Sequence, residues 1–223
     1  GAGDAVNKEA LDEDGGEGMP TTLSGILGEA AGHRGFVIMA LAFFVCGLQL
    51  IFIAVHLPAY LAICGQPPEL GAAALGVIGG FNAIGCFVLG WLGDRFPKHI
   101  LLGSVYILRS LTIVVYFLFP PTTVTTLIFA AVMGVLWLGV APLVNGLVVK
   151  IFGLGFVATL AGIAFLSHQI GSFIGVWGAG LIIDATGSYD LAWQIGVVIG
   201  ITAGIAQIFM DDRPIARVAY AAA

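Results

Sequence analysis

The stretch Gly90–His99 reads GWLGDRFPKH and gathers an acid, two bases and a histidine within ten residues. The chain around it is far poorer in charge, since only 9% of its 223 residues are charged and 59% are hydrophobic. Soluble domains carry about 25% charged residues, so this composition excludes an ordinary water-exposed surface. The stretch therefore indicates a polar link between segments that lie in a bilayer.

Long apolar runs lie on both sides of this link. A helix needs about 20 apolar residues to cross the hydrocarbon core, and six runs meet that length, at about residues 36–62, 70–92, 99–119, 124–149, 156–183 and 191–210. Backbone groups in lipid must be satisfied within the segment, and the runs are far longer than barrel strands. We therefore expect an all-α membrane protein, with a bundle of six transmembrane helices over residues 35–212.

The basic residues sort to one side of these spans. The links on the opposite side hold Glu69, Asp184 and Asp190 but no Lys or Arg. Cytoplasmic loops are enriched in Lys and Arg, so we expect both termini to be cytoplasmic. Seven of the eight basic residues lie on that side: Lys8, Arg34, Arg95, Lys98, Lys150, Arg213 and Arg217.

The two ends of the chain differ from the bundle. Residues 1–34 hold seven of the 13 acids, are rich in glycine and lack the basic-then-apolar order of a signal peptide. We expect them to form an acidic flexible cytoplasmic arm, and residues 213–223 to form a cytoplasmic tail. Residue 1 is Gly rather than Met, which favours a chain that lacks an upstream part.

The second and fifth runs resemble each other. A shift of 86 residues aligns Gly76 with Gly162, Ile84-Gly85 with Ile170-Gly171, Phe87 with Phe173 and Trp91 with Trp177. These two helices run in opposite directions, so the likeness predicts two three-helix units of inverted topology, a 3+3 inverted repeat. The alternative is a chance likeness between two glycine-rich apolar helices.

The opening stretch also carries a resemblance to a family. Its pattern, Gly90-x-Leu92-Gly93-Asp94-Arg95-Phe96-x-Lys98, in a link between the second and third helices, resembles the signature loop of the major facilitator superfamily. Pro97 departs from the glycine that is usual there. Three further segments resemble the carboxy-terminal half of its bacterial monocarboxylate-transporter-like branch: Phe44–Tyr60, Leu166–Phe173 and Asp184–Tyr189.

The resemblance implies a secondary transporter of the inner membrane. Such proteins have twelve helices in two bundles, with a small-molecule substrate bound between them near the midplane and, in symporters, a coupled proton. This chain would supply the second bundle, and its amino-terminal six-helix half would be missing. The alternatives are a half-size transporter that works as a homodimer and a membrane scaffold that transports nothing.

Within the signature loop, four residues are candidates for a conformational latch: Gly90, Asp94, Arg95 and Lys98. A carboxylate at a helix exit can accept hydrogen bonds from the amino-terminal N–H groups of a neighbouring helix, while the bases reach the membrane interface. Such contacts could hold one conformational state and break in another. The alternative is a pair of ordinary bases that only set the topology.

Arg109 lies ten residues into the third helix and is the one strongly charged residue at bilayer depth. Burying it costs about 2.5–3.5 kcal/mol on insertion scales, so it needs a partner or a wet cavity. It is a candidate counter-charge for an anionic substrate such as a carboxylate. The alternative is a structural charge that is bonded to carbonyl groups or to an acid in the missing half.

Six uncharged polar residues complete the candidate substrate-binding set. His56 and Gln49 are seven residues apart on the first helix and so share one face. A histidine could also carry a coupled proton, because no acid lies inside the spans. Each of the six could equally be a polar contact between helices: Gln49, His56, Asn82, Asn145, His168 and Gln169.

Other classes of function find little support. Ser167 and His168 are adjacent on a helix, so their side chains diverge and cannot form a nucleophile–base pair. Two histidines give no haem pattern, and Cys46, Cys64 and Cys86 lack metal-ligand spacing. No basic patch suggests nucleic acid. The sequence thus predicts a transporter that is not an enzyme, with no cofactor and no metal.

Overall fold

The computed structural model describes residues 22–221. Over this range the chain forms helices and no strand. In chain order the helices are α2 (Leu23–Gly32), α3 (Arg34–Ile63), α4 (Pro68–Gly93), α5 (Lys98–Phe117), α6 (Thr123–Val135), α7 (Val140–Phe152), α8 (Val157–Thr186), α9 (Asp190–Ile208) and α10 (Ala216–Ala221). The predicted fold class is confirmed.

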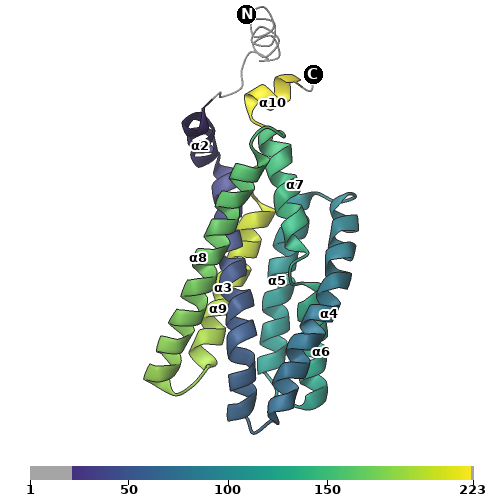
Figure 1. Cartoon of the computed structure of the whole chain (residues 1–223), viewed down its shortest axis with the longest axis vertical. Coiled ribbons are helices and arrows are strands. Elements are labelled where there is room, and N and C mark those ends of the chain that lie inside the picture. The colour runs from purple at the N-terminus through teal and green to yellow at the C-terminus, as the bar shows by residue number, and fades with distance from the viewer. Residues whose placement is uncertain (1–21, 222–223) are drawn as a thin grey trace, which may run out of the picture.

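The six predicted spans are present. Within the described residues, six helical segments are long and apolar enough to cross a membrane: α3, α4, α5, α6 with α7, α8 and α9. The fourth span differs from the prediction of one continuous run over 124–149, because α6 and α7 lie end to end with Leu136–Gly139 between them (Figure 1). Gly134 lies near the end of α6 and Gly139 is the last residue of the interruption, and glycine weakens a helix interior.

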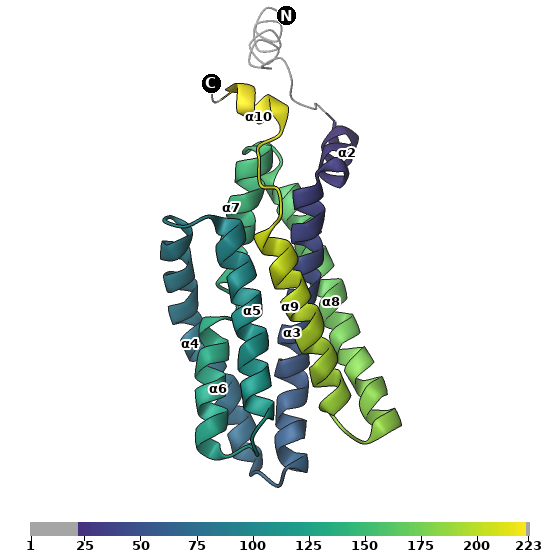
Figure 2. The ribbon, with the colours of Figure 1, turned by 180° about the vertical axis from the view of Figure 1, so that it is seen from behind.

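The helices run as an antiparallel bundle. The links after α3, α5 and α8 gather at one end, whereas α2, α10 and the link between α7 and α8 lie at the other (Figures 1 and 2). Arg34, Arg95, Lys98, Lys150 and Arg213 belong to links or helix ends on the side of α2 and α10. The basic residues are therefore sorted along the bundle axis, and the cytoplasmic assignment of that end stays a prediction.

The helix pairs with the most extensive contacts are α3 with α8, α4 with α6, and α5 with α9. Small residues let such helices approach closely in lipid, where dispersion drives packing. A methyl group on any of four glycines would overlap a backbone carbonyl of the partner helix: Gly47 against His168 and Gly171 against Phe44 in the first pair, Gly85 against Val135 and Gly134 against Ile78 in the second.

These contacts have the symmetry of the inverted repeat. Exchanging the first three spans with the last three turns the α3–α8 pair into the α6–α4 pair. In each pair both helices contribute a glycine that packs against the partner's backbone, and α8 adds a second one at Gly175, against Leu48. The α5–α9 pair maps onto itself, with Gly103 and Gly204 each packed against the other's carbonyl oxygen. The bundle is therefore the predicted 3+3 arrangement.

Part of the segment expected to be a flexible arm is helical. The Thr22 hydroxyl accepts a hydrogen bond from the Gly25 N–H at 3.3 Å and caps α2, and Ile26 and Ala30 are buried. Apolar residues at helical spacing and an amino-terminal cap stabilise a helix in this segment. The rest of the predicted arm, residues 1–21, and the last two residues of the predicted tail lie outside the described residues.

Candidate functional site

Polar side chains from two neighbouring helices form hydrogen bonds with the backbone of the interruption in the fourth span. Arg109 of α5 donates from Nη2 to the carbonyl oxygens of Leu136, at 2.5 Å, and Trp137, at 3.1 Å. Asn82 of α4 accepts the Leu138 N–H on its Oδ1 at 2.9 Å. Backbone groups freed by a break at membrane depth need such partners. Both candidate residues thus hold the break in place.

Arg109 has no exposed surface. Its Nη1 donates to the Cys46 sulfur at 3.2 Å, and its Nε has no hydrogen-bond partner. The carbonyl end of a helix carries partial negative charge, so the end of α6 favours a cation here. Of the two readings of Arg109, these contacts match the structural charge bonded to carbonyls. Direct contact with a substrate would require the bundle to open.

Gln49 ties three helices together in the bundle core. Its Nε2 donates to the Ser110 hydroxyl of α5 at 3.1 Å and to the Gly196 carbonyl of α9 at 2.8 Å. The side chain is only 1% exposed, and its Oε1 has no partner. Gln49 therefore does not lie on a surface that a solute could reach in this structure.

His56 bridges α3 to the interior of α8 and to Tyr189, the residue before α9. Its Nε2 lies 3.2 Å from the Val176 carbonyl oxygen, and its Nδ1 lies 3.2 Å from the Tyr189 hydroxyl. A carbonyl can only accept, so Nε2 carries the proton and Nδ1 accepts from tyrosine when the ring is neutral. Both ring nitrogens are therefore satisfied within the bundle.

His168 lies on α8 and is nearly buried, whereas the adjacent Gln169 is exposed. The ring Nδ1 is 3.1 Å from Oε1 of Gln169. The imidazole packs between Phe43, with ring centroids 4.8 Å apart, and Phe165, at 5.8 Å. Two aromatic rings thus cover the histidine.

Those two rings also line a hollow between α3, α7 and α8. It has a volume of about 330 Å³ and is lined by Phe43, Ala141, Val144, Asn145, Ala161, Gly162 and Phe165. Asn145 of α7 is exposed, and its side-chain amide forms no hydrogen bond with another described residue, so it is free for a ligand. The structure therefore brings Asn145, His168 and Gln169 to one region, away from Gln49 and His56.

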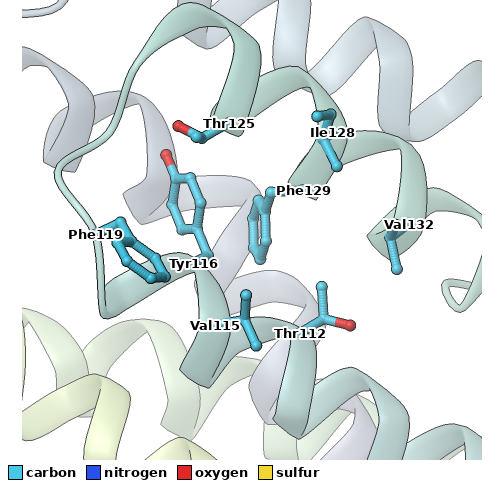
Figure 3. Close-up of a pocket in the computed structure, with 8 residues that line it drawn as sticks. All are labelled: Thr112, Val115, Tyr116, Phe119, Thr125, Ile128, Phe129 and Val132. Atoms are coloured by element: carbon cyan, nitrogen blue, oxygen red, sulfur yellow. The ribbon is translucent and has the colours of Figure 1, made fainter.

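A second hollow of about 300 Å³ lies between α5 and α6 (Figure 3). Its wall is almost wholly apolar and includes the stacked rings of Tyr116 and Phe129, whose centroids are 4.2 Å apart. The Tyr116 hydroxyl is already paired with Thr126 at 2.9 Å. None of the candidate residues lines this hollow, and it offers little to recognise a polar solute.

The signature loop is only partly engaged. Asp94 is exposed, and its carboxylate makes no hydrogen bond or ion pair with any residue from 22 to 221. Arg95 stacks on Trp91, its Cζ 3.8 Å from the ring centroid, while Lys98 donates to the Gly93 carbonyl at 2.8 Å. Gly90 has open space where a side chain would lie. The contacts expected of Asp94 are absent from this bundle, and the latch stays a prediction.

An ion-pair cluster that the sequence analysis did not predict lies at the same end of the bundle. Asp212, just after α9, accepts from His99 of α5 at 2.8 Å and from Lys150 of α7. Burial raises the pKa of Asp212, but hydrogen bonds from Lys150 and His99 outweigh burial, and the net shift is downward. Two adjacent acids after the last span, Asp211 and Asp212, on the basic side, were the available signal.

An inverted-repeat bundle of six spanning helices, with polar groups held between them, is an arrangement found in many membrane transporters. Comparison with known families agrees, because the model for the Major Facilitator Superfamily matches residues 6–176. The chain belongs to the Major Facilitator Superfamily, whose members are transporters rather than enzymes. No curated protein was found to match it.

Proposed function

We propose that this chain is one bundle of a secondary active transporter, the second half of a twelve-helix protein that moves a small organic anion such as a monocarboxylate by alternating access. The observation that carries the proposal is the hollow between α3, α7 and α8, with the free amide of Asn145 on its wall and His168 behind its two aromatic rings. Concave sites with few polar groups are typical of solute binding.

The charge inside the bundle supports an anion. Arg109 is fully buried, and its described partners are neutral: one thiol and two carbonyls. The carboxylates of the described spans, Glu69, Asp184 and Asp190, lie at span ends. An uncompensated cation in a low-dielectric interior makes the potential positive. Arg109 then favours an anion in the hollow without touching it.

The low burial of α4 and α8 supports the proposal of a partner bundle. These two helices are the least buried of the spans, so their outer faces are open. Gly76, Gly79 and Gly80 on α4 and Gly162 and Gly178 on α8 have no neighbour where a side chain would stand. Small residues four apart let helices pack in lipid. A second six-helix bundle would use these faces, with Asp94 free to cap one of its helices, and a homodimer would use the same surface.

The test is solute uptake by the transporter in proteoliposomes. We expect accumulation of a monocarboxylate such as lactate, driven by an inward proton gradient, and no uptake of its neutral amide. Asn145→Ala should raise the KM several-fold, because one hydrogen bond to the substrate is lost. Thr112→Ala, in the apolar hollow of Figure 3, serves as the matched control. Equal uptake of acid and amide would exclude an anion transporter.

A further inference from the structure

A third hollow lies between the end of α5 and the start of α9, at the end of the bundle opposite α2 and α10. It has a volume of about 310 Å³, within the size range of ligand sites. Its wall includes Leu118 and Val198, which are 69% and 63% exposed. Figure 2 shows α5 and α9 in front, with α4 and α8 to either side. The hollow therefore opens toward lipid, away from the faces of α4 and α8 that a second bundle would use.

The polarity of the wall changes along the bundle axis. On α9, Asp190, Gln194 and Val198 follow one another at intervals of four residues and so share one face. A helix rises 1.5 Å per residue, so the aliphatic side chain lies about 12 Å deeper than the carboxylate. The α5 side of the wall is apolar throughout: Ile113, Val114, Phe117 and Leu118. A charge, an amide and then aliphatic groups follow the order of a phospholipid from headgroup to acyl chain.

Three polar groups of this wall have no partner within residues 22–221. The side chains of Asp190 and Gln194 are exposed and form no hydrogen bond or ion pair there. Trp193 also lines the hollow and is only 3% exposed, yet its Nε1 N–H has no acceptor. A buried donor without an acceptor is unfavourable. An oxygen atom of a bound molecule would supply the acceptor.

The charge at this end of the bundle favours a cationic headgroup. The links after α3, α5 and α8, with the adjoining helix ends, hold Glu69, Asp184 and Asp190 but no Lys or Arg. Of these acids only Asp190 lines the hollow. A carboxylate attracts a cation and repels an anionic headgroup. It also accepts hydrogen bonds from a primary ammonium, which has three N–H donors, whereas a quaternary ammonium has none.

We propose that this hollow binds a phospholipid with a primary ammonium headgroup, such as phosphatidylethanolamine. The ammonium lies at Asp190, and phosphate or ester oxygens accept hydrogen bonds from the Gln194 amide and the Trp193 indole. One acyl chain extends along Val198 against α5. The rings of Phe117 and Trp193, with centroids 3.7 Å apart, form part of the wall beside it. Tryptophan is common at this depth of membrane proteins.

The lipid site is separate from the proposed transport site. It shares no lining residue with the hollow that holds Asn145. Its occupant is a component of the membrane and not the transported solute. Binding of the lipid can therefore be measured without any transport assay, and its outcome is independent of the proposed function.

Native mass spectrometry of the purified chain in detergent tests the headgroup preference. Phosphatidylethanolamine and phosphatidylglycerol with identical acyl chains are added in equal amounts, and the lipid that stays bound is identified by its mass. We expect one phosphatidylethanolamine per chain, bound several-fold more tightly than phosphatidylglycerol. Asp190→Asn keeps the shape of the side chain and should abolish this preference. Asp184→Asn, which removes an acid at the same end but outside the hollow, should keep it.

Tryptophan fluorescence tests the location of the lipid. Phosphatidylethanolamine with brominated acyl chains quenches an indole that it contacts. Trp193→Phe should lose the saturable part of the quenching, because the indole in the hollow is gone. Trp177→Phe removes an exposed indole of α8 and should keep that part. Circular dichroism of each variant verifies that the bundle is folded.

Three outcomes would overturn the proposal. The first is equal affinity of the wild-type chain for the two lipids, and the second is an unchanged preference in folded Asp190→Asn. The third is saturable quenching that persists in Trp193→Phe, which would place the lipid elsewhere on the bundle. None of these outcomes bears on whether the transporter moves an organic anion.

Discussion

Arg109 on α5 donates a hydrogen bond to the carbonyl oxygen of Trp137, in the interruption between α6 and α7. The one full charge at mid-depth among the described residues thus binds the backbone of an interrupted helix and does not face an open cavity. A guanidinium has several donors in one plane, which suits two successive carbonyls and a thiol. The same contact explains why an arginine is tolerated in lipid and why the fourth span can bend.

Replacing Arg109 with Gln should destabilise the bundle. Two carbonyls and the Cys46 sulfur lose their donor, and an unsatisfied buried group costs about 1–3 kcal/mol. Chemical unfolding of the purified chain in mild detergent measures the change in free energy. Arg109→Lys should lose less and keep the anion preference, because its charge remains. Stability equal to wild type in Arg109→Gln would contradict the assigned contacts.

Replacing Gly47 with Ala should loosen the α3–α8 pair, because the new methyl group would overlap the His168 carbonyl. Overpacking of this kind costs about 1–3 kcal/mol. Gly180→Ala on α8 is the matched control, since nothing lies near that position in the chain. Thermal unfolding followed by circular dichroism distinguishes the two variants. Equal melting of both would show that close approach at Gly47 is unimportant.

The ion-pair cluster of Asp212 predicts a dependence of stability on pH. The pKa of this carboxyl is lowered in the folded chain, so its contribution is present above the ordinary pKa of aspartate and is lost as pH falls through the lowered value. Asp212→Asn should remove that acid-dependent part, which is about 1 kcal/mol or less for a partly exposed pair. Unfolding measured across acidic pH provides the test.

The neighbouring acid gives the control for this prediction. Asp211 is more exposed than Asp212, and its one ion pair, with Arg213, has a distance of 3.8 Å. Asp211→Asn should therefore leave the pH profile of wild type. Identical profiles for the two variants would mean that Lys150 and His99 do not stabilise the Asp212 carboxylate.

Because one face of α4 is open, we expect a substitution there to affect association with a second bundle but not the stability of this chain. Gly80→Leu should leave the unfolding of this chain unchanged, since nothing in the described bundle lies near the position. It should weaken association with a second bundle, measured by co-purification or by the size of the detergent-solubilised particle. Retained association would place the partner on another face.

The inverted repeat is a feature of the fold that the sequence alone predicted. Lipid allows only segments that satisfy their own backbone groups, so apolar length alone predicted six helices. The match of Gly85 with Gly171 correctly marked related helices, and the structure gives both glycines the same role against a partner carbonyl. Periodicity and chain length are local properties, which is why these predictions needed no tertiary structure.

The partners of the polar residues could not be predicted in this way. Arg109, Asn82 and the fourth span are separated along the chain, and only helix packing brings them together at Leu136–Gly139. A helix interruption inside an apolar run leaves no change in composition, since its backbone groups are satisfied by other helices. The same holds for Asp212 with His99. The sequence determined the spans and their order, and tertiary packing decided which charges and hydrogen bonds meet between them.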